Sequence, residues 1–297
     1  MADLVDGRGP SRGTDGDFGS PYQGLPLLYH LSFLHDLLNY STALLWLLAY
    51  VALMLKVQRE RNAYGLSFQS LFALVWVEVS NVLLILCLLV YHNKPIHAEF
   101  FIVDCSSALI SLAAFVYINR YFSSTYESQR DNFGKRFCRL LCGKLCVDKF
   151  SWLFLYLVAF IISCPMFFLR RSKYAAPLAV IASNGSFRLF ALTALSFWEC
   201  FNDSVLALAL VPQLFMFYNK RPRKVTNLLG TFVALLFFAR ICAFLYWLTF
   251  TWFHTSEPTG RGIHLLTEAL NILILLDFLY HYIRAKLAGE RDISLPI

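Results

Sequence analysis

Seven apolar stretches, each long enough to cross a lipid bilayer, constrain the fold of this chain more than any other feature of its sequence. A helix needs about 20 apolar residues to span the hydrocarbon core of a membrane. The seven stretches are residues 36–56, 67–91, 98–119, 151–169, 187–218, 226–253 and 263–283. Hydrophobic residues make up 58% of the 297 residues and charged residues only 15%, which excludes an ordinary soluble domain. The sequence therefore predicts an all-α polytopic membrane protein with seven transmembrane helices.

The distribution of Lys and Arg predicts the orientation of these helices, because cytoplasmic loops are enriched in positive charge. Seventeen of the 26 Lys and Arg residues fall in the odd-numbered loops and after the last helix, and eight fall on the other side. We expect a disordered lumenal tail at 1–34, a membrane domain at 35–284 with a cytosolic insertion at 120–150, and a cytosolic tail at 285–297. The net charge of +7 follows from this bias, so no nucleic-acid partner is implied.

Two segments of the chain resemble each other and predict an internal repeat. When residues 54–75 are laid over 216–237 without gaps, Arg59 falls on Arg221, and each segment is a helix end, a basic turn and the next helix start. Two copies in the same orientation, separated by one helix, give a three-plus-one-plus-three arrangement. Parallel repeats of this kind place a shared site near the middle of the membrane.

A proline and a glutamine interrupt the fifth apolar stretch at Pro212 and Gln213. Proline removes a backbone donor from a helix and frees a carbonyl one turn earlier, which neighbouring groups in the membrane must satisfy. The pair predicts either a hinge between the repeats or a structural kink without motion, and the sequence leaves both interpretations open.

Three motifs stand out in the sequence: VPQLFMF at 211–217, FSSTYESQRDNF at 122–133, and the ending DFLYHYI…ISLPI within 277–297. They resemble the KDEL receptor family, the receptors that retain lumenal proteins of the endoplasmic reticulum (ER), within the PQ-loop superfamily. The resemblance covers roughly 40–297, apart from an insertion around 134–150. It implies a seven-helix fold like that of sugar carriers.

The resemblance also implies a function. Members of this family capture escaped lumenal proteins by a C-terminal KDEL-like tetrapeptide in the Golgi and return them to the ER by a retrograde coat (COPI). The expected location is the ER and cis-Golgi membrane, and the expected partners are these lumenal proteins, the coat and the bilayer. No enzyme motif, cofactor motif or metal-ligand spacing is present in the sequence, so we expect no catalysis.

Several residues match positions that the family uses. Arg240 falls at the sixth-helix Arg of the ligand site, and a charge at that depth costs about 3 kcal/mol or more, so it needs an interior partner. Asp277 matches the seventh-helix Asp required for transport. The other expected site residues are Trp247 and Tyr246 on the sixth helix, Glu199 and Asp203 on the fifth, and Lys286 and Arg291 as coat-facing residues beyond the last helix.

Other family positions are altered, which makes this chain a divergent member. The second-helix Arg that clamps the ligand carboxylate is replaced by Val79, the first-helix Arg by Asn39, and the pH-sensing first-helix His by Trp46. A cation is therefore missing from the expected site.

The repeat suggests what replaces the missing cation. Glu78 overlays Arg240 by the offset that aligns the two turns, so Glu78, with Val79 and Ser80, lies at the site of the missing cation. We predict a buried Glu78–Arg240 ion pair, which would weaken attraction for an anionic ligand. In the alternative, Glu78 faces the lumenal interface and Asp203 pairs with Arg240. Which tetrapeptide is read is left open.

Three functional hypotheses are alternatives to the retrieval receptor: an orphan carrier for a small solute, a receptor for a modified and less acidic signal, and a scaffold without a ligand. A receptor needs a pocket open to the lumen, whereas a carrier needs access from both sides. The sequence decides neither solute transport nor the oligomeric state.

Two kinds of modification site also appear. Cys138, Cys142 and Cys146 recur every fourth residue beside basic residues, which predicts either palmitoylation or an unmodified amphipathic segment. Asn184 begins an Asn-Gly-Ser glycosylation sequon in a loop expected to be lumenal. His254 and His264 flank the sixth loop on the side expected to be lumenal, where histidines can confer pH dependence. We expect both instead to be solvated at the membrane interface.

Overall fold

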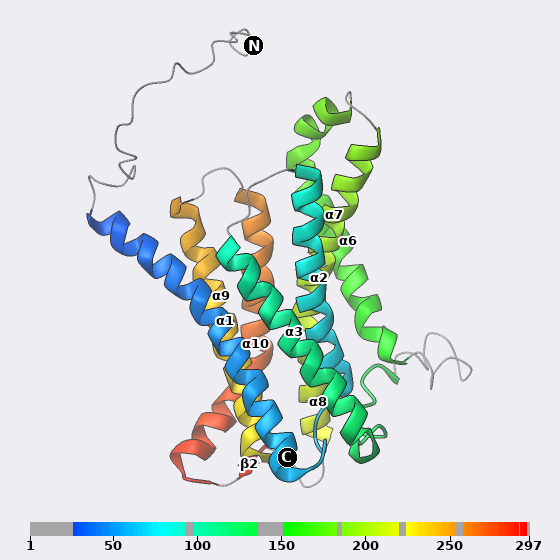
Figure 1. Ribbon diagram of the computed structural model, residues 1–297, viewed down its shortest axis with the longest axis vertical. Coiled ribbons are helices and arrows are strands. Elements are labelled where there is room, and N and C mark those ends of the chain that lie inside the picture. Colours follow the sequence, from blue (N-terminus) through cyan, green and yellow to red (C-terminus); the bar gives the residue numbers. More distant parts are fainter. Residues whose placement is uncertain are drawn as a thin grey trace.

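The computed structural model describes residues 26–92, 98–135, 151–182, 186–219, 224–253, 258–290 and 292–295. Seven of its helices are long: α1 (Pro26–Glu60), α2 (Phe68–His92), α3 (Ala98–Phe122), α6 (Phe154–Ala182), α7 (Ser186–Leu208), α9 (Asn227–Phe253) and α10 (Pro258–Leu287). They run between the same two ends of the molecule (Figure 1). A shorter helix α8 (Val211–Asn219), two single 3₁₀ turns (Ser123–Thr125 and Ser151–Leu153) and two three-residue strands complete the described elements.

Six helical stretches of the described chain are long and apolar enough to cross a membrane. They are Phe33–Glu60, Phe68–Cys87, Phe101–Thr125, Thr193–Asn219, Asn227–Thr249 and Gly262–Leu287. Large apolar side chains such as Ile102, Leu109 and Leu273 are about two-thirds exposed on their outer faces, as suits contact with lipid tails. The prediction of a polytopic helical membrane protein is confirmed. The seventh expected span, at 151–169, falls in α6, whose described apolar stretch Phe154–Phe168 is shorter, so this span stays a prediction.

The helix boundaries differ from the expected ones at both ends of the membrane domain. Helix α1 begins at Pro26, so residues 26–34 are helical rather than part of a disordered tail. The reason is local: the segment after Pro26 is already apolar, and proline is well suited to the first turn of a helix. Helix α10 continues to Leu287, so Lys286, which we expected beyond the helix, lies in its last turn.

Each long helix packs against particular neighbours. Helix α1 lies against α9 and α3, α2 against α3 and α7, α10 against α9 and α7, and α6 against α7. Aromatic side chains fill the core between them. Tyr50 and Phe232 lie with ring centroids 6.2 Å apart, and Phe217 and Phe278 lie 5.4 Å apart. All four side chains are fully buried, so the helices share one continuous core.

The fifth apolar stretch is two helices rather than one. Helix α7 ends at Leu208 and α8 begins at Val211, so the break lies directly before Pro212. Proline has no backbone N–H and its ring clashes with the preceding turn, so it can stand in the first turn of α8 but not inside a longer helix. The predicted interruption is therefore present, whereas motion at this break stays a prediction.

A buried carboxylate caps the start of α2 at one end of the bundle. The hydroxyl of Ser67 donates to Asp131 Oδ1 at 2.9 Å, and the hydroxyl of Tyr126 donates to Asp131 Oδ2 at 2.5 Å. The backbone N–H of Gln69 donates to the same carboxylate at 3.3 Å. Asp131 and Tyr126 belong to the motif at 122–133, so this motif is a cap for a neighbouring helix.

Gln213 binds the same turn from the other side. The backbone N–H of Ser67 donates to Gln213 Oε1 at 2.8 Å, and Gln213 Nε2 donates to the carbonyl of Gly65 at 2.7 Å. The backbone N–H of Gln213 donates to Ser70 Oγ at 2.8 Å. Gln213 and Asp131 thus join three distant segments, and we name this set, with Ser67, the Gln213–Asp131 junction.

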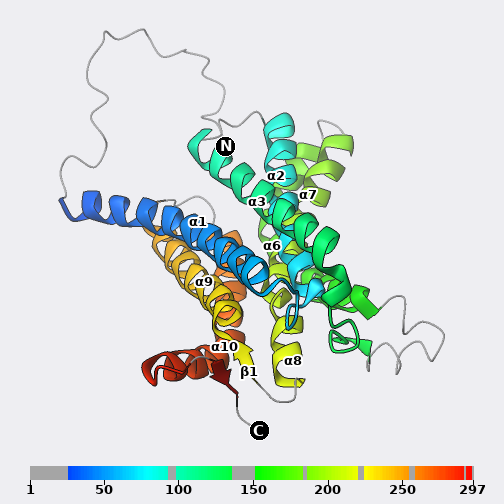
Figure 2. The ribbon, with the colours of Figure 1, turned by 60° about the horizontal axis from the view of Figure 1, so that its bottom comes forward.

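The C-terminal segment is docked onto the same end of the bundle (Figure 2). Strand β2 (Asp292–Ser294) pairs antiparallel with β1 (Lys224–Thr226), and Ile293 lies opposite Val225. Ile293 is 2% exposed, and its side chain occupies the space beside Gly230, where a Cβ would lie 2.1 Å from Ile293 Cδ1. Residues 292–295 are therefore held against the protein rather than extended from it.

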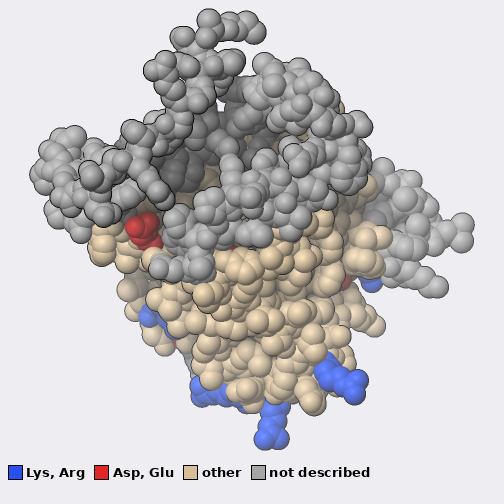
Figure 3. All heavy atoms as spheres, turned by 45° about the horizontal axis from the view of Figure 1, so that its top comes forward, with Lys and Arg blue, Asp and Glu red and all other residues tan. Residues whose placement is uncertain are grey.

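Positive charge gathers toward one end of the molecule, beyond a broad band without charged side chains (Figure 3). The exposed basic residues of this end include Arg59, Arg61, Arg120, Lys224 and Arg284. Among the side chains that the structure describes, Arg240 is the only Lys or Arg away from this end. The asymmetry agrees with the loop count, and which end faces the cytosol stays a prediction.

Candidate ligand-binding site

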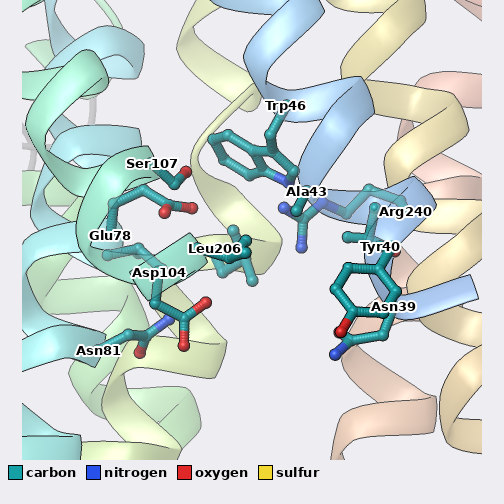
Figure 4. A pocket seen from close by; sticks show the side chains of 13 residues that line it. Asn39, Tyr40, Ala43, Trp46, Glu78, Asn81, Asp104, Ser107, Leu206 and Arg240 are labelled. Atoms are coloured by element: carbon teal, nitrogen blue, oxygen red, sulfur yellow. The ribbon is translucent and has the colours of Figure 1, made fainter. Parts of the chain in front are cut away.

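A cavity of about 170 Å³ lies midway along the helices, between α1, α2, α3 and α9 (Figure 4). Arg240 stands at the middle of α9, and Glu78 near the middle of α2. The cavity has two unlike walls. Glu78 and Asp104 extend from α2 and α3, and Arg240 faces them from the side of α1 and α9 with Trp46 and Tyr40.

Arg240 is held from behind by a partner on α10. Its Nη1 donates to Glu268 Oε1 at 3.1 Å, and its guanidinium lies 4.8 Å from the ring centroid of Trp46. Arg240 is 6% exposed and Glu268 5%. The predicted Glu78–Arg240 ion pair is wrong: both residues line the cavity, as the repeat suggested, but α10 packs directly on α9 and brings Glu268 closer.

The alternative partner Asp203 is bound to a histidine instead. His264 Nδ1 lies 3.1 Å from Asp203 Oδ2, and His264 Nε2 lies 3.5 Å from Glu199 Oε1. The imidazole stacks on Trp247 with ring centroids 4.1 Å apart and an angle of 11° between the planes. The expectation of a solvated His264 is therefore wrong, because α10 begins at Pro258 and carries His264 inward against α7.

Tyr246 faces a different neighbour from Trp247. Its ring stacks on His35 of α1 at 4.2 Å, and His35 Nδ1 is 2.9 Å from Thr249 Oγ1. Neither Tyr246 nor Trp247 lines the cavity, although both were expected in the ligand site. They join α9 to α1 and to α10.

Polar side chains connect the cavity to α7. Ser80 Oγ donates to Asn202 Oδ1 at 2.9 Å, and the indole N–H of Trp198 donates to Ser80 Oγ. Asn202 Nδ2 donates to Asn81 Oδ1 at 3.1 Å, and Asn81 lines the cavity. Ser80 therefore supports the cavity from outside, and Val79 is not among its lining residues.

These features can be compared with known proteins. The family model described as ER lumen protein retaining receptor matches residues 62–250, which is more than half of the chain. The chain belongs to the ER lumen protein retaining receptor family. No curated protein matches the chain.

The family model covers only some of the residues that form the cavity and its surroundings. It begins at the turn held by the Gln213–Asp131 junction and includes Glu78, Asp104 and Arg240. It ends before α10, so the carboxylate partner of Arg240 and the imidazole between Asp203 and Glu199 lie outside the matched range. In this member of the ER lumen protein retaining receptor family, the electrostatic surroundings of Arg240 come from both parts.

The residues expected to act in transport lie away from the cavity. Asp277 is exposed and accepts a hydrogen bond from the hydroxyl of Tyr218, and His281 Nε2 is 3.8 Å from its carboxylate. Lys286 Nζ lies 5.7 Å from the ring centroid of Tyr282. Arg291 lies outside the described residues, as do Cys138, Cys142, Cys146, Asn184 and His254.

Two carboxylates of the site escaped the sequence analysis. Asp104 lies in the predicted third span and Glu268 in the seventh. Charged residues inside membrane spans are costly and mark functional or paired positions. The rule that was applied to Arg240 holds equally for Asp104 and Glu268, so the signal was present in the sequence.

Proposed function

We propose that this member of the ER lumen protein retaining receptor family binds the C-terminal signal of escaped lumenal proteins and returns them to the ER. The family match over residues 62–250 carries this proposal, because the family is one of receptors that retain ER lumenal proteins. The cavity with Arg240 is the binding site that fits it. Arg has five N–H donors and Glu268 engages one nitrogen, so others remain for a peptide carboxylate.

The network of hydrogen bonds at one end of the bundle supports access from the lumen. The Gln213–Asp131 junction ties α2, α8 and the loop after α3 together at the end where Lys and Arg gather. A ligand would therefore reach the cavity from the opposite end. That end is the lumenal one by the positive-inside rule.

The contacts between helices support the three-plus-one-plus-three arrangement of two repeats. In a three-plus-one-plus-three arrangement, α1, α2 and α3 correspond to α7, α9 and α10. The neighbours α2–α3, α1–α3 and α2–α7 then correspond to α9–α10, α7–α10 and α9–α1, and all six pairs are in contact. Ligand binding would shift the equilibrium between two packings of these repeats. The retrograde coat (COPI) would read the basic C-terminal segment with Lys286 and Arg291.

The test is direct binding of a peptide ending in Lys-Asp-Glu-Leu to the purified protein in lipid nanodiscs. We expect binding that requires the free carboxylate, so an amidated peptide fails, and binding that is tighter in acid than at neutral pH. The control is the double variant Arg240→Gln with Glu268→Gln, which removes the cation without leaving a buried carboxylate unpaired. Binding that survives in this variant would contradict the proposed site.

A second function is favoured by the two carboxylates Glu78 and Asp104 in the cavity, which suit a small cationic solute better than an acidic peptide. A carrier for such a solute must also open at the Gln213–Asp131 junction. Uptake of the solute into vesicles that contain the protein distinguishes this carrier from a receptor, which binds its ligand without flux.

A further inference from the structure

We propose that Glu78 and Asp104, which we call the acidic wall, bind a cationic group of the ligand, an ammonium or a guanidinium. The ligand is therefore dipolar, with a cation on the acidic wall and a carboxylate at Arg240. For a peptide ligand this inference rests on the proposed receptor function. The inference implies a C-terminal signal of different chemistry, in which a basic side chain replaces the acidic side chains of a KDEL-like tetrapeptide.

The first argument is that both carboxylates face the same cavity. Glu78 and Asp104 extend from neighbouring helices into the space between the two walls, with Ser107 beside them (Figure 4). Neither forms an ion pair with any Lys, Arg or His in the described part of the chain. Two carboxylates thus point into one cavity near the middle of the membrane, and the cation that lines the same cavity, Arg240, forms its ion pair with Glu268 instead.

The second argument concerns the charge of Arg240. This arginine already has a carboxylate partner, Glu268, at 3.1 Å, and the face of Trp46 lies beside it. Its charge is therefore largely balanced from behind, whereas the charges of the acidic wall are not. Glu78 and Asp104 are only partly exposed, and a carboxylate that is partly removed from water without a counter-charge is disfavoured. A ligand cation removes this cost, and a ligand carboxylate on the same wall increases it.

The third argument comes from the aromatic lining. Trp46 and Tyr40 line the cavity across from the acidic wall. The faces of such rings attract ammonium and guanidinium groups when water is excluded. Trp46 already contacts Arg240 in this way, so Tyr40 is the ring that can assist the acidic wall in binding an organic cation.

Two sources can supply this dipolar chemistry. One is the C-terminus of a lumenal protein with Lys or Arg near its terminal carboxylate. The other is a free basic amino acid. The tetrapeptide Lys-Asp-Glu-Leu also supplies a carboxylate and one Lys, but its Asp and Glu bring like charges toward Glu78 and Asp104, which weakens its binding relative to a peptide without acidic side chains.

The experiment measures competition for the purified full-length protein in lipid nanodiscs. The ligands are tetrapeptides ending in Lys-Lys-Lys-Leu and in Lys-Asp-Glu-Leu, together with free L-lysine and L-arginine. The variants are Glu78→Gln, Asp104→Asn and their combination. The matched control is Glu290→Gln, which neutralises an exposed carboxylate at the end of α10, away from the cavity. Thermal unfolding verifies that each variant is folded, and either single variant suffices if the combination does not fold.

We expect the basic peptide to bind at least tenfold more tightly than the acidic one. Neutralising the acidic wall should abolish this preference, and Glu290→Gln should leave it unchanged. Binding of free lysine or arginine without either peptide supports the acidic wall but overturns the receptor function. Tighter binding of the acidic peptide, unaffected by Glu78→Gln and Asp104→Asn, overturns the acidic wall and leaves the receptor function standing. Binding of none of these ligands overturns both.

Discussion

Arg240 and Glu268 form an ion pair inside the helix bundle, with Nη1 of the arginine 3.1 Å from Oε1 of the glutamate. Both side chains are buried, and the second oxygen of Glu268 has no hydrogen-bond partner among the described residues. The pair joins α9 to α10 directly behind the cavity. Because each charge depends on the other, the two residues should act as one unit in stability and in binding.

Replacing only one member of this pair should be far more costly than replacing both. Arg240→Met leaves Glu268 as an unpaired buried charge, and breaking a buried pair in this way costs about 3–5 kcal/mol. The double variant Arg240→Met with Glu268→Leu should recover most of that loss, because apolar groups of similar volume replace the pair. Unfolding of the four proteins in detergent provides the double-mutant cycle. Equal losses in the single and double variants would show that the pair is not coupled.

The Asp131 cap should make the protein more stable in acid. Burial raises the pKa of the Asp131 carboxyl above its ordinary value of 3.8, although hydrogen bonds from Tyr126 and Ser67 oppose the rise. A carboxyl whose pKa is raised in the folded state contributes stability that is fully present below the ordinary value. This contribution is lost as the pH rises through the raised value.

The comparison of wild type with Asp131→Asn isolates this contribution. Asparagine cannot titrate, so the wild type should gain stability over the variant as the pH falls from 7 toward 3.8. Denaturant unfolding at a series of pH values measures the difference. A difference that stays constant, or that grows with rising pH, would contradict the raised pKa.

Gln213 should matter more for stability than the proline beside it. Gln213→Leu leaves the N–H of Ser67 and the carbonyl of Gly65 without their partner, and each orphaned buried group costs about 1–3 kcal/mol. Pro212→Ala removes no hydrogen bond and should cost less than about 1 kcal/mol. Thermal unfolding ranks the two variants. A hinge role for Pro212 predicts the reverse in a binding or transport assay, where Pro212→Ala would be the more harmful change.

The space beside Gly230, which the side chain of Ile293 occupies, should control the docking of strand β2. In Gly230→Val the new side chain occupies the position of Ile293 Cδ1, so β2 should leave β1. The substitution Leu295→Cys places a thiol at a position that is buried in the wild type and leaves Ile293 in place, and this thiol should then react faster with a maleimide by tenfold or more. Gly262→Val is the matched control, because a Cβ there meets nothing within 4 Å. Equal labelling rates in the two backgrounds would show that the strand does not depend on this space.

The sequence predicted the elements of the fold well because membrane helices are selected by length and apolarity alone. The predicted repeat overlaid Glu78 on Arg240, and both residues line one cavity. The sequence did not predict the partner of Arg240 correctly. The predicted repeat pairs α2 with α9, but it carries no information on how closely α10 packs against α9, and that packing brings Glu268 into reach.

The remaining misses have a similar origin. His264 was judged by its place near a loop, but the earlier start of α10 carries it between Asp203 and Glu199. The motif at 122–133 identified the family but not its physical role, because its Asp131 acts on Ser67, a residue 64 positions away. Side-chain contacts between distant segments depend on packing that periodicity cannot reveal.

The hydrogen bond between Ser67 and Gln213 spans 146 residues of sequence, and this separation bears on how the protein is made. Membrane helices enter the bilayer in the order of synthesis, so the start of α2 is inserted long before α8 leaves the ribosome. Until then the N–H of Ser67 and the carbonyl of Gly65 lack their native partner. The early helices therefore remain in the membrane with these two backbone groups unpaired until Gln213 is inserted. During this interval the assembly machinery of the ER membrane can shield them.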